Sequence, residues 1–332
     1  MTDASATRKP RALWYASRGR AVLREGELPP RQDDHVRVET LWSGLSRGTE
    51  RLVFTGRVPA SEYARMRAPR QEGAFPFPVK YGYAAIGIVR EGPRALVGRT
   101  VFALNPHETV FDAPADFVQP VPDHVPARRA VLAANMETAL NALWDGGAGP
   151  GDRIVVVGAG VVGALVAALA SRLPGSEVTL VDVDLSRRTI AEALGCRFAK
   201  PLDAPGNADL VFHTSATSAG LSCALACAGD EATIVEMSWY GEATTRVSLG
   251  AAFHSGRLKL ISSQVGRVSE SRRGRWSYAR RLAKALDLLD DPRLDALITE
   301  EVAFDDLPEA LPRLFAPGAP GLATAIRYAS GA

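Results

Sequence analysis

Cysteine is scarce in this sequence of 332 residues, which contains only Cys196, Cys223 and Cys227. An odd number of cysteines in so long a chain argues against a disulfide framework and favours a reducing compartment. Residues 1–10 also lack the apolar run of a secretory signal. We therefore expect a cytoplasmic protein.

The sequence also has no large excess of positive or negative charge. The formal net charge is +2, so the expected partner is a small molecule rather than nucleic acid or a membrane surface. Hydrophobic residues make up 46% and charged residues 23% of the chain, which is typical of folded globular proteins. The chain is longer than one hydrophobic core usually serves, so two domains are expected.

Long apolar runs are rare, and the one that spans residues 154–170 needs an explanation. Its length is close to that of a membrane-spanning helix. However, it contains three glycines, and Asp152 and Arg172 flank it. A buried strand followed by a buried helix explains this pattern better, so no membrane segment is expected.

Hydrophobic periodicity divides the chain into a β-rich part and a part with alternating strands and helices. In the first part, strands are predicted at residues 36–40, 77–89, 100–103 and 109–111, and a partly helical piece at 57–72. A cluster of Pro, Asp and His at 120–126 predicts the boundary.

The alternation of strands and helices in the second part predicts a parallel sheet, because neighbouring strands that run in the same direction need helical crossovers. Its predicted elements are a helix at 128–144, strands at 153–157, 177–181, 210–213, 233–237 and 258–262, and an amphipathic helix ending near residue 291. A tail with a segment at 297–303, a helix at 307–315 and a strand at 323–328 is expected to return to the first domain. The predicted domains are therefore 1–125 with 293–332, and 126–292.

The sharpest motif is a G-x-G-x-x-G pattern that follows the β-branched strand 153–157. Gly158 permits a tight turn, Gly160 lets the backbone approach a pyrophosphate, and Gly163 allows close packing of helix on strand. Val161 and Val162 begin the predicted helix, and their backbone N–H groups would bind the phosphates. The motif predicts a site for a nicotinamide dinucleotide.

Asp182 ends the next predicted strand, nineteen residues after Gly163. An acid at this place accepts hydrogen bonds from the adenosine ribose and repels a 2′-phosphate, so NAD is favoured over NADP. Arg187 and Arg188 follow closely and keep NADP open. The structural alternative is that Asp182 only caps a turn.

The order of a β-rich beginning, a late Rossmann unit and a returning tail resembles the medium-chain dehydrogenase/reductase superfamily. This resemblance implies an α/β fold with a doubly wound parallel Rossmann sheet, an irregular and mostly-β GroES-like catalytic domain, and a homodimer. Where the family's alcohol dehydrogenases carry zinc ligands, this chain has Ser46, Tyr83 and Ala134. These side chains do not hold zinc, so a zinc-independent enzyme is expected.

The loop 43–50, Ser-Gly-Leu-Ser-Arg-Gly-Thr-Glu, most resembles the bacteriochlorophyllide dehydrogenase branch, which oxidises a hydroxyethyl group on a chlorin ring. The loop is also similar to that of zinc-less relatives usually labelled alcohol dehydrogenases. The resemblance implies a secondary alcohol or ketone on a small or ring-bearing substrate. Arginines at 57, 65, 67 and 70 make an anionic substrate more attractive.

Without a metal, a side chain or water must handle the hydroxyl proton. Tyr83 is the first candidate, because it replaces the zinc-ligand histidine and a phenol can donate to a carbonyl oxygen. Ser46 and Thr49 lie on the loop that the resemblance places opposite, and they are candidates for a proton relay. Ordinary turn hydroxyls and a packed tyrosine are the structural alternatives.

Four further titratable residues are candidates under stated conditions. Lys80 could lower the pKa of a phenol if it points inward, although a solvated lysine is commoner. His107 lies on a loop that borders the substrate cleft in the family, although a surface histidine is the commoner case. Glu50 and Glu137 could act as bases only if they are buried.

The resemblance also implies cofactor contacts outside the glycine motif. Arg47 matches a position that contacts the pyrophosphate, and Thr138 matches the threonine that supports the nicotinamide ring. Ser215 and Ser238 follow later strand ends, where doubly wound sheets bind ligands. The arginines between residues 267 and 281 are expected to form a solvated face, with substrate or partner binding as the alternative.

Three functions remain open from the sequence. The first is a zinc-independent, NAD(H)-dependent oxidoreductase that interconverts a secondary alcohol and a ketone. The second is an enone or quinone reductase, which needs less local acid catalysis. The third is a cofactor-binding protein without chemistry.

Overall fold

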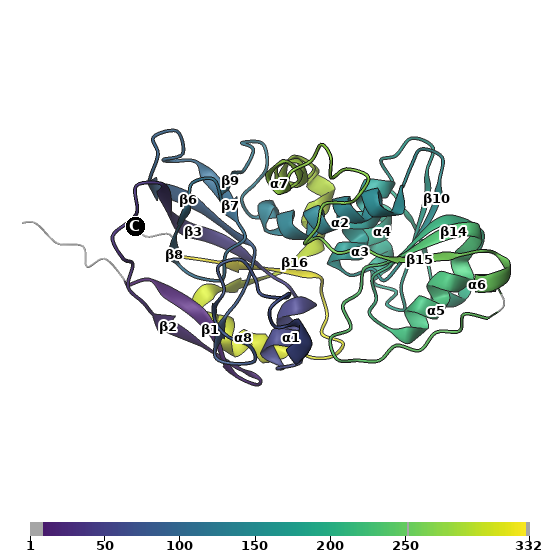
Figure 1. Ribbon diagram of the computed structural model, residues 1–332, viewed down its shortest axis with the longest axis horizontal. Coiled ribbons are helices and arrows are strands. Elements are labelled where there is room, and N and C mark those ends of the chain that lie inside the picture. Colours follow the sequence, from purple (N-terminus) through teal and green to yellow (C-terminus); the bar gives the residue numbers. More distant parts are fainter. Residues whose placement is uncertain (1–8, 251, 330–332) are drawn as a thin grey trace, which may run out of the picture. The chain divides into compact units, whose positions relative to one another are not determined.

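The computed structural model describes residues 9–250 and 252–329, and it divides them into two compact units (Figure 1). One unit contains the residues up to Val131 and those from Glu300 onwards, and the other contains Leu132–Thr299. The boundaries predicted from the sequence, at 125/126 and 292/293, lie slightly earlier along the chain. The tail pairs with the first part, since β17 (Ala323–Arg327) is antiparallel to β3 (His35–Leu45).

The second unit is built on a parallel sheet, as the alternating pattern predicted. The sheet order is β12-β11-β10-β13-β14-β15, and all neighbouring strands are parallel. The strands are β10 (Arg153–Val157), β11 (Glu177–Val181), β12 (Arg197–Ala199), β13 (Ala208–His213), β14 (Ala228–Glu236) and β15 (Lys259–Ser262). The three-residue β12 was not predicted, because it is too short to show a period.

The direction of strand addition reverses between β10 and β13, so the crossover helices cover opposite faces of the sheet. Figure 1 shows α3 and α4 along one side and α5 and α6 along the other. The helices of this unit are α2 (Ala133–Gly146), α3 (Val161–Ala170), α4 (Arg187–Ala193), α5 (Ser218–Cys227), α6 (Ala252–Ser255) and α7 (Tyr278–Asp287), with 3-10 turns at Arg129–Leu132, Pro201–Asp203 and Pro292–Leu297. This reversal is where doubly wound sheets bind their ligands.

The long apolar run of the sequence consists of most of β10 and all of α3. Both elements are buried in the sheet layer and the helix layer of the second unit, which explains the run without a membrane. Among residues 9–250 and 252–329, no helix combines the length and the apolar character that crossing a bilayer requires.

Arg281 is buried, with 2% of its surface exposed, although its arginine-rich segment was expected to be solvated. That expectation is wrong for this residue, because α7 is amphipathic and turns position 281 toward α2. Its Nε donates to Glu137 Oε1 at 2.9 Å, and a terminal nitrogen donates to Asn141 Oδ1 at 2.6 Å. A further donor reaches the carbonyl of Arg267 at 3.0 Å. The side chain therefore ties the segment after β15 to α2.

Replacing Arg281 with methionine should lower the free energy of unfolding by about 3–5 kcal/mol, because the Glu137 carboxylate is then left buried without its partner. Urea unfolding followed by circular dichroism measures this change. Arg273→Met is the matched control, since Arg273 is exposed in the same segment and should change stability by less than about 0.5 kcal/mol. Equal stability of the two variants would show that the buried pair contributes nothing.

The first unit is mostly β, as predicted. One sheet has the order β2-β1-β5-β4, and the other has the order β16-β17-β3-β6-β7-β9 with β8 paired to β3. Its other strands are β1 (Arg11–Ser17), β2 (Arg20–Glu25), β4 (Glu72–Gly73), β5 (Val79–Lys80), β6 (Ala85–Glu91), β7 (Thr100–Ala103), β8 (Val110–Pro114), β9 (Gln119–Pro120) and β16 (Ile298–Ala303), and its helices are α1 (Thr49–Phe54) and α8 (Leu307–Leu314), with 3-10 turns at Ala60–Glu62 and Phe304–Asp306.

Segment 57–72 differs from the sequence expectation of a partly helical piece. It contains one 3-10 turn, Ala60–Glu62, and otherwise consists of turns and irregular backbone until β4 begins at Glu72. Pro59 and Pro69 remove backbone donors on either side of that turn and prevent a longer helix. The segment therefore forms a loop of the first unit.

Candidate active site

The glycine motif forms the turn between β10 and α3. Gly158 has a φ of +108°, which a side chain rarely allows, and a Cβ at Gly163 would lie 1.9 Å from the carbonyl oxygen of Gly158. Gly160 is exposed and has open space where a Cβ would be. Two glycines thus shape the turn, and the third leaves its outer side free for a ligand.

The amino end of α3 follows this turn directly. Gly160 is the N-cap residue and supplies no capping side chain, so the amides of Val161 and Val162 remain available to an anion. The turn and the helix end together have the form of a pyrophosphate cradle.

The Asp182 carboxylate lies beside the glycine turn, at the end of β11. One oxygen accepts a hydrogen bond from Ala159 N at 2.6 Å, and the other accepts from Asp184 N at 2.8 Å. Each carboxylate oxygen can accept more than one bond, so the half-buried group keeps capacity for ribose hydroxyls. Both nearby arginines are engaged: Arg187 pairs with Asp184 at 3.2 Å, and Arg188 stacks over a phenylalanine ring at 5.1 Å.

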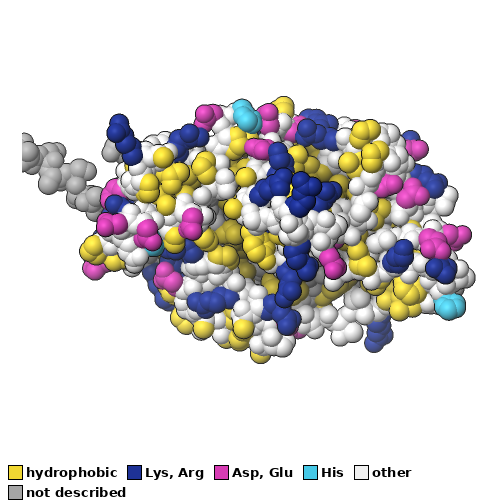
Figure 2. Space-filling model, turned by 45° about the horizontal axis from the view of Figure 1, so that its top comes forward, with side chains coloured by type: hydrophobic (Ala, Val, Ile, Leu, Met, Phe, Trp, Pro, Cys, Tyr) yellow, Lys and Arg dark blue, Asp and Glu magenta, His cyan; other side chains and the backbone are white. Residues whose placement is uncertain are grey.

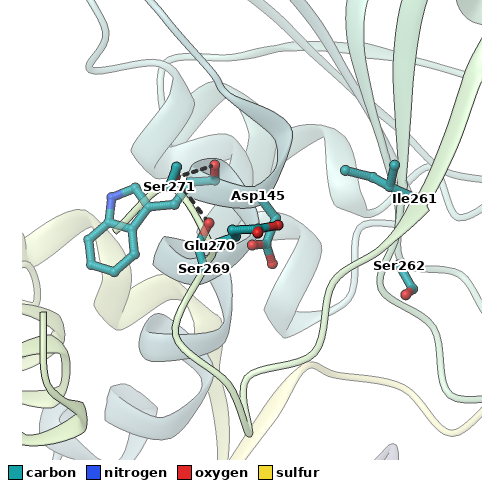
Figure 3. A pocket seen from close by; sticks show the side chains of 7 residues that line it. Asp145, Ile261, Ser262, Ser269, Glu270 and Ser271 are labelled. Carbon is teal, nitrogen blue, oxygen red and sulfur yellow. Dashed lines mark hydrogen bonds between the residues drawn. The ribbon is translucent and has the colours of Figure 1, made fainter. Parts of the chain in front are cut away.

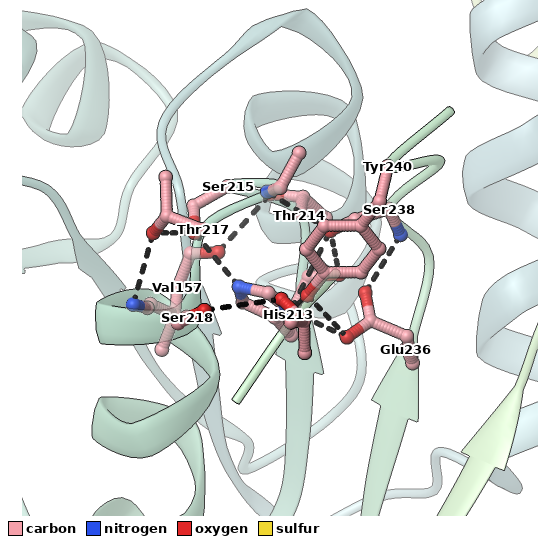
Figure 4. A network of polar contacts seen from close by, with 12 residues as sticks. Val157, His213, Thr214, Ser215, Thr217, Ser218, Glu236, Ser238 and Tyr240 are labelled. Carbon is pink, nitrogen blue, oxygen red and sulfur yellow. Dashed lines mark hydrogen bonds and ion pairs between the residues drawn. The ribbon is translucent and has the colours of Figure 1, made fainter. Parts of the chain in front are cut away.

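A network of polar side chains joins the carboxyl ends of β13 and β14 (Figure 4). His213 Nδ1 lies 2.7 Å from Glu236 Oε2, and its Nε2 lies 2.7 Å from Ser215 Oγ. Tyr240 donates to Glu236 Oε2 at 3.0 Å, and Ser238 N donates to Glu236 Oε1 at 2.8 Å. The two predicted serines therefore flank a histidine–glutamate pair at the sheet edge where ligands bind.

Burial and hydrogen bonding shift the pKa values of two side chains in this network. Burial would raise the pKa of Glu236, but its interactions with His213 and Ser238 lower it below the usual value. Burial raises the pKa of Tyr240 to about 12. Glu236 was missed from the sequence. The signal that could have found Glu236 is its register, since it faces His213 as the last residue of the neighbouring strand.

In the first unit, Tyr83 lies near the hydroxyls of Ser46 and Thr49, both of which favour its ionised form. Burial and the charge of Glu50 raise the pKa of Tyr83 to about 12, and these two hydroxyls oppose the rise. Tyr83 remains partly exposed. The phenol is thus kept protonated at neutral pH.

Glu50 and His107 form a fully buried pair behind this tyrosine, with 0% of either residue exposed. His107 Nε2 lies 2.9 Å from Glu50 Oε2, which also accepts from the Tyr15 hydroxyl at 2.6 Å. The other Glu50 oxygen accepts from Ser46 N at 2.8 Å, which fixes the Ser46 loop. The expectation that His107 lies at the surface is therefore wrong. Glu50 meets the condition of burial that the sequence left open.

Both ring nitrogens of His107 have partners. A carboxylate can only accept, so Nε2 donates to Glu50, and Nδ1 lies 2.8 Å from Ser43 Oγ. Ser43 in turn lies 3.0 Å from the hydroxyl of Tyr328, on β3 and after β17 respectively. Hydrogen bonds thus run from the interior of the sheet to the loop that carries Ser46.

Lys80 is buried, although a solvated lysine was the commoner expectation. Its Nζ contacts Glu108 Oε2 at 2.9 Å and also pairs with Glu72. Burial would lower the pKa of Lys80, but these two carboxylates raise it. Because Tyr83 is not among its contacts, nothing in this arrangement supports the hypothesis that Lys80 lowers the pKa of a phenol.

The remaining candidates have protein partners of their own. Arg47 donates to the backbone carbonyls of residues 319–321 at 2.6–2.9 Å, and Thr138 Oγ1 donates to Ala134 O at 2.9 Å. Burial raises the pKa of Glu137 against the opposing effect of Arg281. Glu137 is therefore held in an ion pair and does not form a free base.

Arginines in segment 57–72 were considered as contacts for an anionic substrate. Arg65 pairs with Glu62 at 3.1 Å, and Arg67 donates to backbone carbonyls of its own loop. Arg70 donates to Asn105 Oδ1 at 2.9 Å. Three of these guanidinium groups are thus already bound within the first unit.

The donor set at the family's zinc positions does not suit zinc. A serine hydroxyl, a phenol with its proton and an alanine methyl replace the thiolates and imidazole that zinc requires. Both ring nitrogens of the nearby His107 are engaged in hydrogen bonds. Within the described part of the chain, no group of three or more His, Cys, Asp or Glu side chains is arranged to hold a metal.

A pocket of about 480 Å³ opens at the carboxyl end of β15 in the second unit (Figure 3). Figure 3 shows Asp145 and Glu270 on one side of it and Ile261 and Ser262 on the other. No residue of the glycine turn lines it, so it is not the pyrophosphate cradle.

The sequence matches no model of a protein family. Among curated proteins it is 27% identical over 209 residues to an uncharacterised zinc-type alcohol dehydrogenase-like protein of Haemophilus influenzae, covering 56% of this chain and 60% of that protein. It is 27% identical over 197 residues to D-guloside 3-dehydrogenase of Escherichia coli K12, covering 55% and 56%. The alignments thus span little more than half of these relatives.

Solved structures share the fold over nearly the whole chain. L-idonate 5-dehydrogenase of E. coli K-12 has a TM-score of 0.77 at 14% identity, covering 96% of this chain and 98% of that one. A Sinorhizobium meliloti protein bound to NADP has a TM-score of 0.76 at 16% identity, and an E. coli CFT073 alcohol dehydrogenase complexed with NADH has one of 0.75 at 16%. Each covers 96% of this chain and 99% of its own.

Proposed function

We propose that this chain is a zinc-independent, NAD(H)-dependent oxidoreductase that interconverts a secondary alcohol and a ketone. It has the two-part fold of the medium-chain dehydrogenase/reductase superfamily, and its relatives are alcohol- and sugar-dehydrogenase-like oxidoreductases, as the sequence resemblance implied. The observation that carries the proposal is the glycine turn with a carboxylate beside it. The substrate is proposed to be a small or ring-bearing molecule.

The residues present fit a nicotinamide dinucleotide. The open side of Gly160 and the uncapped start of α3 would receive the pyrophosphate, and Asp182 would accept the ribose hydroxyls. A 2′-phosphate would meet that carboxylate, and Arg187 is already paired with Asp184, so we propose NAD(H) rather than NADP(H). Fluorescence titration should show NADH binding about tenfold or more tighter than NADPH, and the reverse preference would contradict this assignment.

The nicotinamide, when bound, supplies or accepts the hydride. Tyr83 is proposed to donate its phenolic proton to the carbonyl oxygen of a ketone. Burial and the neighbouring Glu50 charge keep the proton on the phenol, and the hydroxyls of Ser46 and Thr49 would stabilise the phenolate that remains after transfer. Glu50 and His107 are proposed as positioning residues, because they hold the Ser46 loop.

The pH dependence of ketone reduction should reflect the raised pKa of Tyr83. Because that pKa is about 12, the phenol stays protonated between pH 6 and 9, and its ionisation should cause no loss of kcat in this range. Initial rates of NADH oxidation across the range, compared with those of Tyr83→Phe, measure this. A decline above pH 8 in the native protein that is absent from the variant would show that Tyr83 titrates much lower.

A homodimer is also proposed, on the basis of the exposed edge of the parallel sheet. β15 is an outer strand, and Leu260 on it is 37% exposed. An exposed edge strand presents unpaired backbone N–H and C=O groups that can pair with a second chain. Light scattering should give twice the mass of one chain, and the mass of a single chain at micromolar concentration would contradict the proposal.

A further inference from the structure

An apolar pocket of about 460 Å³ opens between α2, α3 and the end of α7 in the second unit. Leucines at 140, 143, 169 and 288 line it, together with the ring of Trp144. Its volume lies in the range of small-molecule sites, which is about 300–1,000 Å³. The pocket shares no residue with the glycine turn, the His213 network or the Tyr83 cluster.

Two arginines, Arg172 and Arg272, also line this apolar pocket. Both are exposed, and neither forms an ion pair or a side-chain hydrogen bond within the described ranges 9–250 and 252–329. The charge of Arg172 contributes to the lowered pKa of Asp291, but the main cause is Arg293, which donates to that carboxylate at 2.6 and 2.9 Å. Figure 2 shows Lys and Arg side chains gathered beside exposed hydrophobic ones. The pocket therefore combines an apolar wall with two positively charged guanidinium groups.

The aromatic wall is held in place by a neighbouring ring and by guanidinium groups. The guanidinium of Arg272 lies 5.6 Å from the centre of the Trp144 ring. Trp144 packs against Trp276 with ring centres 4.7 Å apart, and Arg280 lies 4.1 Å above the Trp276 ring. This packing holds the indole in place beside the leucines of the pocket.

We propose that this pocket binds an organic carboxylate with a flat, apolar ring system. The leucines and Trp144 would take up the ring, and the two guanidinium groups would bind the carboxylate, for which their geometry is suited. The neighbouring pocket in Figure 3 shares Trp144 but contains Asp145 and Glu270, whose charges would repel the same ligand. Charge therefore assigns this ligand to the arginine-lined pocket.

Calorimetric titration of the full chain with 2-naphthoate, in saturating NADH, tests the proposal. We expect one saturable site per chain and at least about tenfold weaker binding of 2-naphthamide, which has the same ring without the charge. The variant with both Arg172→Gln and Arg272→Gln should weaken naphthoate binding by about tenfold or more. Arg273→Gln, which lies outside the pocket, should bind as the native protein does.

A second variant, Ala148→Phe, fills the pocket without changing its charge and should also weaken binding. Binding equal to native in both the double-arginine and Ala148 variants would place the naphthoate elsewhere and overturn the proposal. Absence of a saturable site, or equal affinity for the amide, would do the same. NADH binding measured separately should be unchanged in the variants, so loss of the proposed enzyme function would be recognised independently.

Discussion

Gly160→Val should abolish measurable NADH binding while leaving the protein folded. The Cβ at this position points into open space, and the backbone, with φ of −72° and ψ of 179°, suits a valine. The added methyl groups would occupy the place where the pyrophosphate must approach the turn. We expect an affinity loss of about 100-fold or more, and a melting temperature within a few degrees of the native value.

Gly206→Val is the matched control for this experiment. Gly206 is exposed, and its Cβ would also meet no atom within 4 Å, but it lies outside the turn. The control should bind NADH normally. If Gly160→Val binds NADH as tightly as the control does, the nucleotide cannot lie against this turn, and the proposed cofactor site is wrong.

Tyr83→Phe should lower the turnover of ketone reduction by about tenfold or more with the affinity for NADH retained. The reason is the loss of the only proton that the proposed mechanism delivers directly to the substrate oxygen. The ring, which packs edge-on against Tyr81 with centres 6.1 Å apart, stays in place. Steady-state rates and NADH fluorescence separate the two effects.

Tyr81→Phe is the matched control, because Tyr81 is buried beside Tyr83 and lacks the contacts with Ser46 and Thr49. It should retain most of the native rate. An undiminished rate in Tyr83→Phe would remove the residue from the mechanism. Undiminished turnover of enones or quinones, combined with a preference for NADPH, would favour the reductase function that the sequence left open.

The parallel sheet could be predicted closely because its signals are local. Strands β10 and β11 have the predicted bounds, since each is a short β-branched or apolar run with clear punctuation. The hairpin of β1 and β2 was missed, because β1 is a nearly continuous apolar run and β2 carries two arginines and a glutamate, so neither strand shows a clear alternation. Its stability comes from pairing across the hairpin, which a local pattern does not report.

Individual residues of the candidate site could be named from the sequence, but the contacts between them could not. The glycine turn has a fixed spacing, and the sequence therefore located it. The pair of Glu50 and His107 joins residues 57 positions apart, and the pair of Glu137 and Arg281 joins residues 144 apart. Such pairs arise from tertiary packing, so each residue could be named as a candidate without its partner being known.

The buried charges explain why side chains expected at the surface are not there. Lys80 and Arg281 are both long and cationic, and such residues are rarely buried unless they are paired. Each forms an ion pair inside its own unit: Lys80 pairs with Glu108, and Arg281 pairs with Glu137. The sequence favoured exposed positions for both, because their acidic partners lie far away along the chain and cannot be identified from the sequence.

The most direct test of the account is the rate of NADH oxidation with a panel of ketones after the protein has been dialysed against EDTA. We expect turnover that dialysis does not diminish and that added zinc does not increase. Turnover that appears only when zinc is restored would contradict the central claim that protein side chains replace the metal at this site.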